Sequence, residues 1–115
     1  MPEGPEIRRA ADQVARVLVG RQIERASFAF AELQSFEPRI NGAMVKAVDT
    51  RGKAMLTRFD NGLTLFSHNQ LYGRWYTVRR GEMPATRRSL RVALHTHSHS
   101  ALLYSASNVS ILNPE

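Results

Sequence analysis

The first six residues, Met-Pro-Glu-Gly-Pro-Glu, bring together groups that could carry out nucleophilic catalysis. If the initiator methionine is removed, which a small second residue permits, Pro2 exposes a secondary amine that can attack an electrophilic carbon and form an iminium with a sugar aldehyde. An α-amino group has a reference pKa of roughly 7.7–8.0, so about a tenth to a fifth of it is unprotonated at pH 7. Glu3 is the nearest titratable side chain, and a carboxyl group there could move protons and stabilise a developing cation.

The same residues also fit a simpler interpretation, because many proteins begin Met-Pro and a glutamate near a helix start compensates the helix dipole. A helix starting near Pro5 would in either case favour a phosphate close by, through its free N–H groups. A chain that keeps Met1 holds the Pro2 nitrogen in an amide, which is not a nucleophile, and we expect that form to be inactive. The catalytic interpretation therefore needs support from the rest of the sequence.

A helix is predicted over residues 5–19, because apolar residues recur there at helical spacing and charged residues occupy the other face. Pro5 suits the first helical turn, and Gly20 suits the position just past the last turn. The N-terminal groups directly precede this helix. Its apolar positions are Ile7, Ala10, Ala11, Val14, Val17 and Leu18.

Short strands are predicted for most of the remaining chain, since turn residues separate short apolar runs. Asp60-Asn61-Gly62 is a strong hairpin signal, residues 50–53 form a tight connection, and residues 31–40 are a loop or a short helical turn. One helix followed by about eight strands predicts a mainly β fold, an antiparallel two-layer β-sandwich with one long N-terminal helix. The expected strands are residues 23–30, 44–49, 54–59, 63–67, 74–78, 90–96, 101–105 and 109–112.

The chain has 115 residues, which fits one domain, and a formal net charge of +6. Lys46 and Lys53 are its only lysines, so most of the positive charge is arginine, which binds phosphate oxygens in a bidentate way. This indicates a polyanion partner, although a solvated basic surface would give the same balance. The absence of cysteine excludes disulfides and thiolate zinc sites. No signal peptide and no window of membrane-spanning length is found, so we expect a cytoplasmic protein without a membrane partner.

Residues 69–73, Asn-Gln-Leu-Tyr-Gly, form a loop in which two apolar side chains lie between polar neighbours. Leu71 can wedge into a base step, Tyr72 can stack on a base, and Gln70 can pair with an orphaned base edge. The alternative is that the leucine and the tyrosine simply turn back into the core.

Four motifs in order resemble the endonuclease VIII branch of the formamidopyrimidine-DNA glycosylase superfamily. They are MPEGPEIRRAAD at residues 1–12, TRGKA at 50–54, SHNQLYG at 67–73 and LLYSAS at 102–107. The resemblance covers the whole chain, but less than half of such an enzyme. It implies that the chain, residues 1–115, is the N-terminal catalytic domain. The helix–two-turn–helix element and the four-cysteine zinc finger of the full-length family are absent from it, so it would carry no cofactor and no metal.

The resemblance implies a bifunctional DNA N-glycosylase and AP lyase of base-excision repair, acting on damaged double-stranded DNA, as a monomer in the bacterial cytoplasm. Pro2 would form the Schiff base, Glu3 would act beside it, and β- and δ-elimination would cut the strand on both sides of the lesion. Lys53 matches the family's essential lysine, although a solvated lysine at a hairpin is the usual fate of such a residue. A cation there could hold a backbone phosphate and transfer a proton.

The resemblance also assigns roles to the other matching residues. Gln70, Leu71 and Tyr72 match the loop that enters the duplex where the flipped base was, and Asn69 is expected to contact DNA beside them. Glu6 would support the site or only the first helical turn. Arg51 would contact phosphate or merely lie exposed.

Gly4 and the contiguous Gln-Leu-Tyr resemble the pyrimidine-directed branch, which acts on oxidised thymine and cytosine. The alternatives are a purine-directed relative with the same mechanism and a non-catalytic DNA-binding module. His95, His97 and His99 alternate along the chain, but no carboxylate is nearby in sequence. They are therefore interpreted as a polar hairpin rather than a metal site.

Overall fold

The computed structural model describes residues 3–68, 73–106 and 108–113, with only the helical backbone described at residues 3–5. Its first element is the helix α1, Glu3–Leu18, which confirms the predicted N-terminal helix. The buried side of α1 carries Ile7, Ala11, Val14 and Leu18, spaced three or four residues apart as the apolar pattern requires. The helix ends before Gly20, whose φ of +79° lets the chain reverse direction.

The described residues contain eight strands in two antiparallel sheets of four, as the sequence predicts. The first sheet has the order β2-β3-β4-β8, with bounds Val45–Arg51, Ala54–Phe59, Thr64–His68 and Asn108–Leu112. The second has the order β1-β6-β7-β5, with bounds Arg25–Phe28, Leu90–His95, His99–Tyr104 and Arg74–Arg79. The segment expected to be a loop or a short helical turn forms two four-residue helices, α2 Ala31–Gln34 and α3 Glu37–Ile40.

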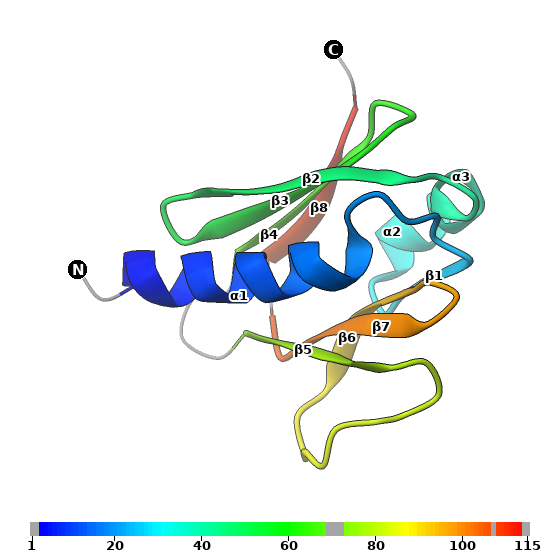
Figure 1. Ribbon diagram of the computed structural model, residues 1–115. Helices are drawn as coiled ribbons and strands as arrows, with labels where there is room; N and C mark the ends of the chain where they lie inside the picture. Colours follow the sequence, from blue (N-terminus) through cyan, green and yellow to red (C-terminus); the bar gives the residue numbers. More distant parts are fainter. Residues whose placement is uncertain (1–2, 69–72, 107, 114–115) are drawn as a thin grey trace.

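The core lies between the two sheets and is closed along one side by α1, which packs against β2 and β3 of the first sheet and β5 and β7 of the second (Figure 1). Met55 and Leu65 enter the core from the first sheet, and Leu94 and Leu103 enter it from the second. A smaller apolar cluster covers the outer face of the second sheet, around Leu102 and Tyr104. In the described part of the chain, no helix is long and apolar enough to cross a membrane.

The His95–His99 tract is a hairpin, as interpreted from the sequence. His95 ends β6, His99 begins β7, and His97 lies in the turn between them, so the three imidazoles do not share one strand face. His95 contacts the Ser100 hydroxyl at 2.6 Å, and His97 lies 3.6 Å from a Glu24 carboxylate oxygen. Among the described residues no group of three or more histidine and acidic side chains could hold a metal ion.

Truncating Leu65, whose side chain is 0% exposed, tests the position of the core between the sheets. Leu65→Ala should lower the free energy of unfolding by about 2–5 kcal/mol, because it removes buried apolar area and leaves a cavity. Chemical denaturation measures this. The matched control is Leu112→Ala on the neighbouring strand, where the side chain is 44% exposed and the change should stay within about 0.5 kcal/mol. Equal losses at the two positions would contradict this placement of the core.

Candidate active site

The direction of α1 determines which residues can reach the start of the chain. Val19, just after the helix, forms a bridge with Val45 at the start of β2, and the Gly20 N–H donates to the Val45 carbonyl at 2.8 Å. The helix packs along β2, and the two elements run in opposite directions (Figure 1). Sixteen helical residues span about 24 Å, and seven strand residues span about 23 Å. The start of α1 is therefore level with the far end of β2.

At that end β2 turns directly into β3. Arg51 pairs with Ala54, so Gly52 and Lys53 form a two-residue hairpin loop. Gly52 has φ +61°, and among the described non-glycine residues only Ser105 has a positive φ. A positive φ at the first loop residue alone is the pattern of a type II′ turn, which matches the twist of the strands. The turn leaves the side chains of Arg51 and Lys53 exposed, beside the start of α1.

Strand register brings two more segments to the same end. His68, the last residue of β4, pairs with Ala54 on one side and with Asn108 on the other. On the second sheet Arg74 begins β5 and pairs with Tyr104, the last residue of β7. We call this the hairpin end: the first turn of α1 together with residues 51–54, 68, 73–74, 104–106 and 108.

The hairpin end is basic. Its described residues outside α1 include no aspartate or glutamate, but they include Arg51, Lys53 and Arg74, all exposed. The half-buried His68 has its Nδ1 atom buried without a hydrogen-bond partner among the described residues. Glu6 lies exposed in the early part of α1. The positive end of the helix dipole adds to this field. An anion approaching this end therefore meets only cations on the turns between strands.

The structure describes the side chains of some site residues proposed from the sequence and not those of others. Lys53 and Arg51 lie together at the hairpin end, and Glu6 lies on the helix that starts there. Glu3 begins α1, but its side chain lies outside the described part of the structure. The remaining predicted site residues, Pro2, Asn69, Gln70, Leu71 and Tyr72, also lie outside the described residues. The described ends of the 69–72 segment, His68 and Arg74, do belong to the hairpin end.

His68 and Arg74 were not among the residues proposed from the sequence. His68 stands within the SHNQLYG motif and Arg74 directly follows it, so position along the chain was an available signal. Their proximity to Lys53 depends on strand pairing, which sequence spacing does not reveal.

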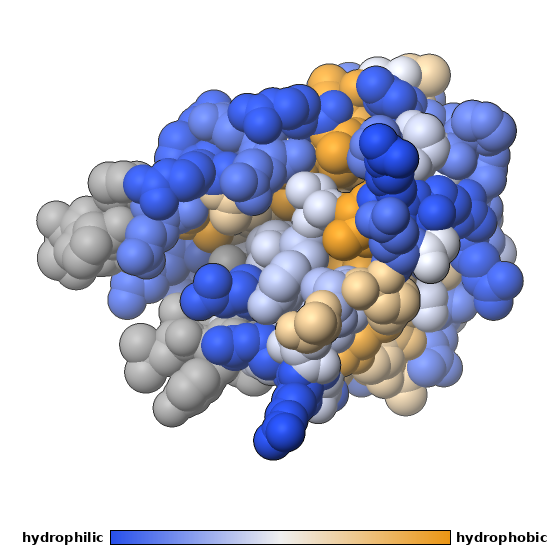
Figure 2. All heavy atoms as spheres, turned by 60° about the horizontal axis from the view of Figure 1, so that its bottom comes forward, coloured by the Kyte–Doolittle hydropathy of each residue, from blue (hydrophilic) through white to orange (hydrophobic). Residues whose placement is uncertain are grey.

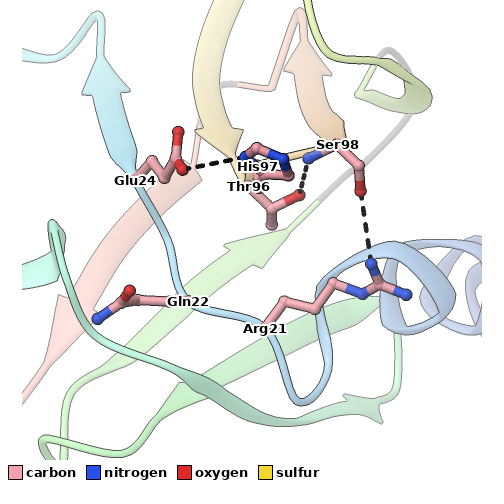
Figure 3. A pocket seen from close by; sticks show the side chains of 6 residues that line it. All are labelled: Arg21, Gln22, Glu24, Thr96, His97 and Ser98. Atoms are coloured by element: carbon pink, nitrogen blue, oxygen red, sulfur yellow. Dashed lines mark hydrogen bonds and ion pairs between the residues drawn. The ribbon is translucent and has the colours of Figure 1, made fainter.

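A pocket of about 230 Å³ lies at the opposite end of the sandwich, where Arg21 donates a hydrogen bond to the Ser98 hydroxyl at 3.4 Å (Figure 3). The Glu24 carboxylate at this pocket accepts a hydrogen bond from Arg80 at 2.8 Å. The hydrogen bond from Arg80 holds the pKa of the Glu24 carboxyl below its usual value. Because these side chains already satisfy one another, the pocket presents no activated nucleophile or base. The lining residues are Arg21, Gln22, Glu24, Thr96, His97 and Ser98.

Residues 1–107 match the model of the formamidopyrimidine-DNA glycosylase N-terminal domain. Endonuclease 8 of Pectobacterium carotovorum is 53% identical over 115 residues, covering 100% of this chain and 44% of that protein. Endonuclease 8 of Salmonella arizonae gives the same identity and coverage. The chain therefore spans less than half the length of the curated relatives it matches.

Solved structures show the same fold at much lower identity. Lactococcus lactis formamidopyrimidine-DNA glycosylase, bound non-covalently to DNA containing an AP site, superposes with a TM-score of 0.81 at 12% identity. The match covers 96% of this chain and 44% of that one. MutM in complex with DNA containing carbocyclic 8-oxo-G gives a TM-score of 0.80, also at 12% identity. At this identity the likeness establishes the fold alone.

We predict that Gly52 is required for the turn that presents Lys53. A methyl group at this position would meet no neighbour within 4 Å among the described residues, so the cost of Gly52→Ala is backbone strain rather than a clash. The free energy of unfolding should fall by about 1–2 kcal/mol. Gly52→Asn should lose less, because asparagine tolerates the left-handed region. Denaturation curves measure both variants, and an alanine variant as stable as the parent chain would refute the strained turn.

Proposed function

The chain belongs to the formamidopyrimidine-DNA glycosylase family, matching its N-terminal domain, and on that premise we propose that it is the catalytic domain of a DNA glycosylase and AP lyase of base-excision repair. The observation that carries the proposal is the antiparallel packing of α1 on β2, which brings the start of α1 level with the Lys53 turn. A nucleophilic N-terminus and an ammonium group could then act on the same sugar.

In the proposed reaction the Pro2 nitrogen attacks the anomeric carbon of the damaged nucleotide as the bond to the base breaks. The sugar ring opens to give an iminium, and a proton must be supplied to the ring oxygen. Loss of a proton from the neighbouring sugar carbon then expels the 3′ phosphate, and a second elimination expels the 5′ phosphate. Glu3 is proposed to move these protons and to stabilise the cation on the sugar.

Lys53 is proposed to hold a phosphate of the lesion strand and to transfer a proton to a leaving group. Two unit charges about 4 Å apart attract by roughly 4 kcal/mol at an effective dielectric constant near 20, which is enough to orient the strand. His68 and Arg51 lie within the same basic end, and we propose phosphate contacts for both. Glu6 is proposed to support the start of α1 rather than to touch the sugar.

The segment 69–72 is proposed to enter the duplex when the lesion is flipped out, because a reacting sugar carbon inside a stacked duplex is out of reach. Leu71 would wedge into the base step, Tyr72 would stack, Gln70 would pair with the orphaned base, and Asn69 would contact the backbone. The location of the flanking residues His68 and Arg74 at the hairpin end supports this role.

Oxidised pyrimidines are the proposed substrates, since relatives more than half identical over the whole chain are named endonuclease 8. A purine-directed enzyme is the second candidate, because the fold is also that of proteins solved with 8-oxo-G and FAPY-dG DNA. We expect the protein to act as a monomer in the bacterial cytoplasm. The chain has no cysteine, so its residues do not fit the four-cysteine zinc finger of the full-length family.

The Schiff base is tested by borohydride trapping on DNA with an abasic site. We expect a chain lacking Met1 to form a covalent adduct at its N-terminal peptide, and a chain that keeps Met1 to form none, because an amide nitrogen cannot attack. The mass of the N-terminal peptide verifies which form is present. An adduct that forms equally well with Met1 retained would rule out Pro2 as the nucleophile.

The role of Lys53 is tested by comparing it with Lys46, the other lysine of the chain. Lys53→Gln should slow trapping by about 100-fold or more, the usual contribution of a positioned proton donor. Lys46→Gln removes the other lysine of the chain, exposed near the opposite end of β2, and should leave the rate unchanged. Similar rates for the two variants would exclude a catalytic role for Lys53.

Substrate class is tested by comparing release of thymine glycol with release of 8-oxoguanine from otherwise identical duplexes. The pyrimidine assignment predicts faster release of thymine glycol, because the Gln-Leu-Tyr segment is that of the pyrimidine-directed branch. Faster release of 8-oxoguanine would favour the second candidate. Binding of DNA without adduct or base release, by a chain free of Met1, would leave only a non-catalytic module.

A further inference from the structure

The second sheet contributes exposed arginines to the hairpin end that the proposed chemistry does not use. Arg74 is exposed, makes no ion pair with any described residue, and pairs in register with Tyr104. Trp75 faces the core between the sheets, whereas Tyr76 belongs to the cluster on the outer face. Strand alternation therefore puts Arg74 on the outer face with Tyr76. The hairpin end therefore has a cation on each sheet, Lys53 on a turn of the first sheet and Arg74 on the outer face of the second.

The segment before β6 is attached to the same end. The Ser105 N–H donates to the Ser89 carbonyl at 2.8 Å, and Leu90 pairs with Tyr104. Since Tyr104 also pairs with Arg74, Leu90 and Arg74 are separated by a single strand, a distance of about 10 Å. Arg87, three residues before Leu90, is exposed and has no ion pair among the described residues.

These arginines lie in a region of one sign. Described residues 86–91 contain three arginines and no acidic residue, like the described residues of the hairpin end outside α1. Tyr76 and Tyr104 pack edge to face beneath this surface, with ring centroids 5.4 Å apart, and burial raises the pKa of the Tyr104 phenol, so no phenolate offsets the cations. On the face shown in Figure 2, hydrophilic residues cover most of the surface and the hydrophobic residues gather mainly in one band.

The opposite end of the same strands is different. Arg79 ends β5 and pairs with His99, and the next residue, Arg80, is bound to Glu24. Arg80 there is paired with a carboxylate, whereas Arg74 makes no ion pair with any described residue. The asymmetry along one strand is what a polyanion bound at a single end of the sandwich requires.

We infer that Arg74 and Arg87 bind backbone phosphates of the DNA, which extends the contact surface from Lys53 on the first sheet around to the outer face of the second. This rests on the proposed function, because it assumes that DNA approaches the hairpin end. Packed sheets lie about 10 Å apart and a DNA strand carries one phosphate per roughly 3.4 Å of helix axis, so Lys53 and the arginines of the second sheet would contact different phosphates. Arginine suits the task, because its planar guanidinium binds phosphate oxygens in pairs.

The test measures the salt dependence of binding to a short duplex with a tetrahydrofuran abasic-site analogue, between about 50 and 200 mM salt. The plot of log affinity against log salt has a negative slope, and each lost phosphate contact reduces the steepness of that slope by about 0.9. We expect that decrease for Arg74→Gln and for Arg87→Gln, and about twice that for the double variant. Arg79→Gln is the matched control, since it removes an exposed arginine from the other end of the same strand. Its slope should not change.

Two results would overturn the inference. If Arg79→Gln lowers the slope as much as Arg74→Gln, only net charge is being measured. If Arg74→Gln and Arg87→Gln keep the parent slope while the Met-processed chain is still trapped on abasic DNA, the proposed function stands and the extended surface is wrong. Failure of the parent chain to bind or to be trapped contradicts the proposed function, and the inference with it. Because both side chains are exposed, thermal melting should be unchanged in every variant, which separates a lost contact from a lost fold.

Discussion

The packing of α1 against the first sheet is the constraint on which the arrangement of the site depends. The α1 side chains Val14 and Leu18 face the core and are fully buried. The bridge between Val19 and Val45 fixes the C-terminal end of the helix at the start of β2. Because a helix rises by about 1.5 Å per residue and a strand by about 3.3 Å, sixteen residues of one match seven of the other. If α1 were one turn shorter, its first residue would lie about 5 Å from the level of the β2–β3 hairpin turn.

Local sequence patterns predicted the elements well and their contacts less well. The apolar spacing from Ile7 to Leu18 predicts α1, and Asp60-Asn61-Gly62 predicts the β3–β4 connection, because each signal is contained in a few neighbouring residues. The two short helices between β1 and β2 were left open, since four-residue helices carry too few positions to show a period. The pairing of β8 with β4 joins residues 40 to 48 positions apart, and no local pattern specifies it.

The same distinction explains which site residues could be identified from the sequence. Lys53 could be proposed as a site residue from the sequence alone, because it stands in a glycine-containing hairpin turn and the surrounding TRGKA motif resembles that of a known family. Arg74 has no such motif, and its place at the hairpin end follows from the pairing of β5 with β7, which aligns its strand end with the turn after Tyr104. Relatives at 12% identity keep the fold with a TM-score of 0.81, because a sandwich core needs apolar volume at alternating positions rather than particular side chains.

Three buried polar groups lie at the hairpin end or directly next to it. The hydroxyl of Ser67, Nδ1 of His68 and the indole nitrogen of Trp75 are buried without a hydrogen-bond partner among the described residues. A buried polar group that has no partner costs about 1–3 kcal/mol relative to a satisfied one. Ser67 and His68 close β4 and Trp75 lies at the start of β5, so all three flank the 69–72 segment. Unpartnered polar groups beside the exposed cations Arg51, Lys53 and Arg74 are features that the packing of the sandwich does not require and that the binding of an anionic partner would use.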